Sequence, residues 1–191
     1  MTFKTHYATP DGFSDMTMFS YGESLIGLCF DDSPDCSKHD FEAKEERDLA
    51  VFRKTKEWLD GYFAGEQPEW TPRLSFARAT PFRREVAQLM LSIPFGQSTT
   101  YGELASRMAK RHGIAKMSAR AVGSAVGWNP ICIIVPCHRV LGSTGNITGY
   151  GGGIENKIAL LRHEGLDVAS LPLPKNSRHW LNAGHSKRQV I

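Results

Sequence analysis

The stretch Ile133-Ile134-Val135-Pro136-Cys137-His138-Arg139-Val140 joins an apolar run to a proline and a cysteine with polar neighbours. Successive β-branched residues are typical of a buried strand, and Pro136 cannot donate to a sheet ladder, so we expect the strand to end there. Cys137 would then lie just past the strand, within reach of solvent. Because cationic or proton-accepting neighbours lower the pKa of a thiol, Cys137 is a candidate nucleophile. The alternative is a small apolar residue of the core.

The composition is that of an ordinary globular protein. Of the 191 residues, 41% are hydrophobic and 23% are charged, which allows one or two domains with a core. No apolar run approaches the roughly 20 residues needed to span a bilayer. Residues 1–6 lack the apolar segment of a secretory signal. We therefore expect no membrane partner and a cytoplasmic protein, or a nuclear one in a eukaryote.

The cysteines form neither a dense disulfide framework nor a CxxC pair; they are Cys29, Cys36, Cys132 and Cys137. Since the expected compartment is reducing, we expect free thiols. A metal site built from Cys29, Cys36 and His39, with His6 as a fourth ligand, is an alternative, although the spacing matches no strong zinc pattern. We therefore predict no metal.

Charge is unevenly distributed although the formal net charge is only +3. Residues 31–48 contain eight acidic and three basic residues, whereas residues 82–140 contain eight basic and two acidic ones. A basic segment around a candidate nucleophile favours a polyanionic substrate such as nucleic acid. The alternative is a solvated basic surface.

Residues 1–80 are expected to form an N-terminal α/β scaffold domain that includes a linker. Within it, residues 16–21 and 24–30, separated by a glycine turn, predict a hairpin. Residues 31–44 predict an acidic loop. Apolar residues at near-helical spacing predict a helix over residues 46–64.

Residues 81–170 predict a mostly helical domain, followed by a basic tail over 171–191. Thr80-Pro81 provides an N-cap and a proline at the first helical position. Residues 100–103 match a capping box, and Ser118 can cap a further short helix. Two short helices joined by a turn fit a helix-turn-helix.

The helix expected over residues 119–126 is built mostly from Ala, Gly and Ser, with Arg120 as its one long side chain. Small residues let a helix approach a partner surface closely; the alternative is tight packing inside the protein. Further on, the glycines around Tyr150 suggest a pocket wall on which a flat ring could stack, or a plain surface loop. The loop lacks the Lys-Ser/Thr ending of a P-loop, which disfavours nucleotide hydrolysis.

Five short motifs stand together in the second half: Tyr101-Gly102, Arg120-Ala121-Val122-Gly123, Asn129-Pro130, Pro136-Cys137-His138-Arg139-Val140 and His163-Glu164-Gly165. Together they resemble the O6-alkylguanine-DNA alkyltransferases, over about residues 82–165. The resemblance implies an α+β protein. Its N-terminal domain would be a small β-sheet plus helix, and its C-terminal domain mostly helical, with a helix-turn-helix and a short strand ending at the active cysteine.

The resemblance also implies DNA repair by direct damage reversal. Cys137 would take a methyl or other alkyl group from O6 of guanine, or O4 of thymine, and keep it, so that one molecule repairs one lesion without a cofactor. His138 would withdraw the thiol proton through a water and Glu164 would orient His138. Asn129 would fix the turn beneath the cysteine. Tyr101 would act on N3 of the leaving guanine.

The substrate pocket implied by the family consists of Val140, Tyr150 and Gly151. The implied DNA-binding residues are Arg120, Ala121, Gly123, Ser124 and Arg139. The partner would be double-stranded DNA containing O6-alkylguanine, bound by a monomer, with the target base rotated out of the stack and Arg120 filling the gap.

Two other function classes compete with this interpretation. A module that recognises alkylated DNA without repairing it would lack a reactive cysteine, and Cys137 argues against that. A thiol hydrolase built on Cys137 and His138 is disfavoured by the Arg120 helix and by the basic segment.

Overall fold

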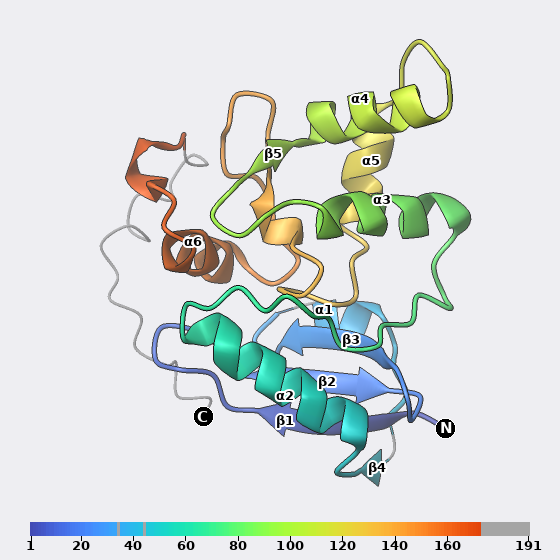
Figure 1. Cartoon of the computed structure of the whole chain (residues 1–191), viewed down its shortest axis with the longest axis vertical. Helices are drawn as coiled ribbons and strands as arrows, with labels where there is room; N and C mark the ends of the chain where they lie inside the picture. Colours follow the sequence, from blue (N-terminus) through green and yellow to red (C-terminus); the bar gives the residue numbers. More distant parts are fainter. Residues whose placement is uncertain (34, 44, 173–191) are drawn as a thin grey trace. The chain divides into compact units, whose positions relative to one another are not determined.

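The computed structural model describes residues 1–33, 35–43 and 45–172 (Figure 1). Within these residues the chain forms two compact units, one of residues 1–77 with 130–132 and the other of residues 78–129 with 133–172. The expected tail lies outside the described residues, apart from its first two positions. None of the described helices has the length and apolar character needed to cross a membrane.

The first unit contains a four-stranded sheet in the order β3-β2-β1-β4. The strands are β1 (Phe3–Tyr7), β2 (Met16–Ser20), β3 (Leu25–Phe30) and β4 (Glu45–Glu46). β2 pairs antiparallel with both β1 and β3, so the predicted hairpin is confirmed. β4 instead pairs parallel with β1.

Helix α2 (Ala50–Phe63) packs along this sheet (Figure 1). Its buried residues, among them Phe52, Leu59 and Tyr62, recur on one face, as the apolar spacing predicted. The helix begins later than expected because Glu45 and Glu46 extend to pair with β1.

Two expectations for the first unit are wrong. The acidic segment contains a short helix, α1 (Asp35–Lys38), and Cys29 and Cys36 form a disulfide instead of staying free. The reason is a tight turn in which Ser33 donates to the Phe30 carbonyl from both its N–H and its Oγ, at 3.1 and 2.8 Å, so that the chain folds back over β3.

No group of three or more His, Cys, Asp or Glu side chains in the described part of the chain could hold a metal ion.

The second unit is mostly helical, and its predicted helix caps are confirmed. The Oγ1 of Thr80 accepts from the N–H of Arg83 at 3.3 Å, and the Oγ of Ser118 accepts from the N–H of Ala121 at 3.2 Å. These caps open two of the four helices, which are α3 (Pro81–Leu91), α4 (Tyr101–Arg111), α5 (Ala119–Val126) and α6 (Ile154–His163). Helices α3, α4 and α5 pack on one another.

A two-stranded parallel sheet brings distant parts of the second unit together. β5 (Thr99–Thr100) pairs with β6 (Val140–Leu141), with Thr99 opposite Val140. β5 leads directly into α4, and β6 follows the 3₁₀ helix η1 (Cys137–Arg139). The pairing therefore places the start of α4 beside the segment that contains the candidate nucleophile.

The strand predicted over residues 133–135, ending at Pro136, is wrong. Residues 132–135 form a turn, with Ile133 at φ 64°, and only Val140 is extended in a strand. The run is buried, as its apolar character indicated. Its backbone is shaped by the side chain of Asn129, whose Nδ2 donates to the Val135 carbonyl at 2.8 Å.

The capping box of α4 gives a first prediction. Thr100 Oγ1 accepts from the Glu103 N–H at 3.1 Å, and the Glu103 carboxylate accepts from the Thr100 N–H at 2.8 Å. Thr100→Ala removes one of these bonds and should lower the free energy of unfolding by about 1 kcal/mol. Thr100→Ser keeps the hydroxyl and should lose less. Urea unfolding measures both, and an alanine variant as stable as the parent would contradict the role of the cap.

Candidate active site

Cys137 lies in a buried turn held by Asn129. Its Sγ accepts a hydrogen bond from Asn129 Nδ2 at 2.9 Å, and the same amide also binds the Val135 carbonyl. The residue is only 7% exposed, so the expectation of a cysteine open to solvent at a strand end is wrong. Asn129 thus fixes both the sulfur and the backbone that precedes it.

A buried carboxylate organises the residues next to Cys137. His138 Nε2 and Glu164 Oε1 lie 2.6 Å apart, and both side chains are fully buried. Arg139 donates to both oxygens of Glu164, from Nε at 2.8 Å and from Nη2 at 3.0 Å, and its Nη1 donates to the Ile93 carbonyl at 2.6 Å. Gly96 N–H donates to Glu164 Oε2 at 3.2 Å. This glycine has φ 71°, and a Cβ on it would lie only 3.0 Å from the Glu164 carbonyl oxygen.

These contacts determine the protonation states of His138 and Glu164. Burial opposes ionisation of Glu164, but the hydrogen bonds from His138 and Arg139 and the charge of Arg139 outweigh it and lower the pKa of Glu164 to about 2. Burial lowers the pKa of His138, which keeps the ring neutral near pH 7. A neutral His138 that donates from Nε2 to the carboxylate has its lone pair on Nδ1. This Nδ1 is buried and has no hydrogen-bond partner among the described residues.

Tyr101 is the first residue of α4, next to the β5–β6 pair. Its hydroxyl lies 3.1 Å from Thr148 Oγ1. Burial raises the pKa of Tyr101, and the nearby Cys137 adds a smaller effect in the same direction, so the phenol keeps its proton at neutral pH. Gly123 of α5 faces the ring, where an added Cβ would lie 3.5 Å from Tyr101 Cδ1.

The three residues expected to form the pocket lie at β6 and in the loop before α6. The Val140 carbonyl accepts a hydrogen bond from Lys157 Nζ at 2.7 Å. The same Nζ lies 5.9 Å from the centre of the Tyr150 ring. Tyr150 and Gly151 are half-buried, and the Tyr150 carbonyl binds the N–H of Gly153 at 3.0 Å.

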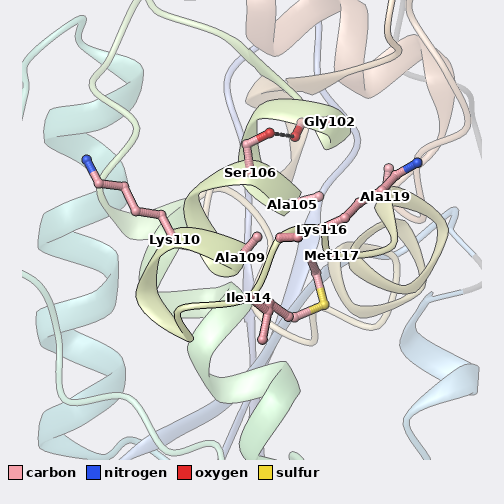
Figure 2. A pocket seen from close by; sticks show the side chains of 10 residues that line it. Gly102, Ala105, Ser106, Ala109, Lys110, Ile114, Lys116, Met117 and Ala119 are labelled. Atoms are coloured by element: carbon pink, nitrogen blue, oxygen red, sulfur yellow. Dashed lines mark hydrogen bonds between the residues drawn. The ribbon is translucent and has the colours of Figure 1, made fainter.

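Helix α5 has an inner and an outer face. Val122, Ala125 and Val126 are buried, whereas the expected DNA-binding residues Arg120, Ala121 and Ser124 are exposed and Gly123 is half-buried. Beside α5, a hollow of about 390 Å³ lies between α4 and the α4–α5 connection. Figure 2 shows small α4 side chains along it, with Lys110 and Lys116 extending away on opposite sides.

Comparison with known proteins identifies the family to which these motifs belong. Residues 81–166 match the family model described as 6-O-methylguanine DNA methyltransferase, DNA binding domain. A methylated-DNA–protein-cysteine methyltransferase of Mycobacterium tuberculosis is 47% identical over 117 residues, which cover 61% of this chain and 67% of that protein. One from Haemophilus influenzae is 36% identical over 160 residues, which cover 84% of each. The chain belongs to this family.

Solved structures of methyltransferases agree with this assignment. The structure of Mycobacterium tuberculosis OGT in complex with DNA matches with a TM-score of 0.71 at 36% identity, over 89% of this chain and 95% of that one. An O6-methylguanine-DNA methyltransferase from Pyrococcus kodakaraensis matches with a TM-score of 0.64 at 26% identity. The α+β fold expected from the sequence is thereby confirmed.

One residue that was expected to bind DNA lies inside the protein. Arg139 was expected to bind DNA, but it is buried and its guanidinium is bound to Glu164 and to the Ile93 carbonyl. Its position in η1 turns it inward beside His138, so it is not available to a phosphate.

Sequence reasoning also missed residues that complete the site. Thr148, Gly96 and Ile93 act through a hydroxyl or a backbone group, which leaves no motif to recognise. Lys157 did carry a signal, because it stands among the inward-facing apolar residues of α6.

The ionised Glu164 gives a prediction for stability against pH. Its pKa in the folded protein is lowered from 4.5 to about 2, so folding favours the charged form. The stability it supplies, about 3 kcal/mol, is complete above the ordinary pKa and is lost as the pH falls from about 4.5 towards about 2.

Glu164→Gln should therefore be less stable at neutral pH and should lack this part of the acid dependence. The exposed Glu57→Gln is the matched control and should behave like the parent. Urea unfolding at several pH values between about 3 and about 7 gives the slopes. A Glu164→Gln protein with the parent's acid slope would contradict the pKa shift.

Proposed function

We propose that this methyltransferase repairs double-stranded DNA by moving a methyl or other alkyl group from O6 of guanine to Cys137 Sγ. The bond between the alkyl carbon and O6 breaks, a carbon–sulfur bond forms, and the guanine leaves with a proton. The observation that carries this proposal is the buried series Cys137–His138–Glu164 in a chain of this family, with the sulfur held by Asn129. Since the nucleophile is also the acceptor, the reaction uses no cofactor.

His138 supplies the base in this proposal. Its Nε2 is bound to Glu164, so the lone pair on Nδ1 is left to take the thiol proton through a water. Glu164 then stabilises the imidazolium that forms. Arg139 acts through Glu164, because its two hydrogen bonds fix the plane of the carboxylate.

Tyr101 supplies the proton that the leaving guanine needs. Its raised pKa keeps the hydroxyl protonated, and its site near Cys137 suits a hydrogen bond to N3 of a bound purine. The Val140 carbonyl would accept from the exocyclic amine of the base. The Tyr150 ring would form the pocket wall, and the amide of Gly151 would lie near O6.

The outer face of α5 provides the DNA contact. Arg120, Ala121 and Ser124 are exposed there, and the small side chains allow a close approach to a groove. Arg120 would enter the gap left by the rotated base. Exposed basic residues on α4 and the following turn, Arg107, Lys110, Arg111 and Lys116, would bind phosphates, so that binding weakens with salt.

We further propose that the protein acts as a monomer in the cytoplasm. All the residues given catalytic roles belong to the second compact unit, which supports residues 81–170 as the reacting domain and residues 1–80 as its scaffold.

A mass measurement tests the proposed function. The purified protein is incubated with a duplex oligonucleotide containing O6-methylguanine. We expect the peptide containing Cys137 to gain the mass of one methyl group, saturating at one per molecule, and Cys137→Ser to gain none. Repair of more than one equivalent would indicate a hydrolase instead, and binding without a mass gain would indicate a recognition module.

The role of Arg120 is tested with two substrates. Arg120→Ala should slow the repair of duplex DNA by about tenfold or more but slow the reaction with free O6-benzylguanine by less than about twofold, because only the duplex must be opened. Arg53→Ala, an exposed arginine of the first unit, is the control. Equal losses on both substrates would contradict a role in opening the duplex.

A further inference from the structure

The loop before α6 contacts the first residue of α4 through a pair of hydroxyl groups. Thr148 Oγ1 and Tyr101 Oη lie 3.1 Å apart, and both residues are half-buried. In the described part of the chain, neither hydroxyl has another hydrogen-bond partner. Thr148 stands just before Tyr150 and Gly151, the expected pocket residues, so the contact lies where the pocket loop meets α4.

Packing holds both members of this pair. Ile147, which directly precedes Thr148, is 1% exposed and belongs to a core cluster with apolar residues of α6. Tyr101 begins α4 directly after β5, and a Cβ added to Gly123 would lie 3.5 Å from its ring. The two hydroxyl groups therefore meet because each backbone is fixed independently of the other.

The direction of this hydrogen bond decides what the phenol can do. Either oxygen could be the donor. If Tyr101 donated to Thr148, its proton would be engaged there and withheld from a bound purine. If Thr148 donates, the phenol proton is free for the purine, and the phenol oxygen has a partner for the negative charge that it acquires when the proton moves.

The pKa of Tyr101 reflects the second arrangement. Burial raises this pKa, and the hydrogen bond with Thr148 acts against burial by lowering it. A donor to the phenol oxygen has this effect, because it favours the charged form. Tyr101 thus keeps its proton at neutral pH but releases it more readily than a buried phenol without Thr148 would.

We propose that Thr148 is a positioning residue that donates a hydrogen bond to Tyr101 Oη and so prepares the phenol to protonate the departing guanine. As the bond between the alkyl carbon and O6 breaks, its electron pair stays on the purine and the Tyr101 proton moves to N3. The phenolate accepts from Thr148 until it regains a proton from solvent, to which the thiol proton has passed through His138. This inference rests on the proposed role of Tyr101 in alkyl transfer to Cys137.

A double-mutant cycle tests the inference. Thr148→Val keeps the shape of the side chain without the hydroxyl, and it is combined with Tyr101→Phe. The rate measured is that of methyl gain on Cys137 from a saturating duplex that contains O6-methylguanine. We expect Thr148→Val to slow transfer about tenfold, with duplex affinity within about twofold of the parent, because the charge on the phenol develops only during the reaction. In the Tyr101→Phe protein, the same change should alter the rate by less than about twofold.

Two matched variants accompany the cycle. Thr148→Ser keeps a hydroxyl and should transfer within about threefold of the parent rate. Thr144→Val makes the same substitution at an exposed position of the same loop and should match the parent. If Thr148→Val does not fold, Thr148→Ala takes its place in the cycle with the same expectations.

A Thr148→Val protein as fast as the parent would overturn the inference. A loss of about tenfold that persists in the Tyr101→Phe background would overturn it as well, because a general disturbance of the pocket does not act through the phenol. A Thr148→Ser protein as slow as Thr148→Val would have the same meaning. Parent protein that gains no methyl group on Cys137 would refute the proposed function instead.

Discussion

The site depends on the buried carboxylate of Glu164 and the hydrogen bonds that it accepts. They come from His138, from the two ends of the Arg139 fork, and from the Gly96 N–H. Leaving a buried charge without its partner costs several kcal/mol. Loss of any one of these donors would therefore destabilise the site. Through these bonds, the end of α6 fixes η1 and the segment that follows α3.

This arrangement determines the charges that Cys137 experiences. Glu164 and Arg139 cancel each other, and the carboxylate holds the proton of a neutral His138 at Nε2. What remains is the basic Nδ1 of His138, which favours loss of the thiol proton. A cysteine that is only 7% exposed can therefore react without being open to bulk solvent.

The parts of the fold that depend on neighbouring residues could be predicted from the sequence. The caps at Thr80, Thr100 and Ser118 each need only residues within one helical turn, and all three are present. The path of residues 132–135 could not be predicted, because it depends on a hydrogen bond from the side chain of Asn129. The Cys29–Cys36 disulfide likewise depends on how α1 folds back over β3.

Within the site, the sequence motifs identified Cys137, His138 and Glu164. They did not show which of the neighbouring side chains are buried. The family resemblance implied that Arg139 binds DNA, yet its side chain is used inside the protein. Lys157 could have been found from its place in the apolar row of α6. The general lesson is that a charged residue in helical register with core residues merits the same scrutiny as a reactive cysteine.

The ¹⁵N chemical shifts of the His138 ring, recorded near neutral pH, test the central claim most directly. If Glu164 sets the state of this ring, the spectrum will show a single neutral imidazole with its proton on Nε2 and a lone pair on Nδ1. An imidazolium, or a ring that carries its proton on Nδ1, would contradict the claim that the buried carboxylate prepares the base.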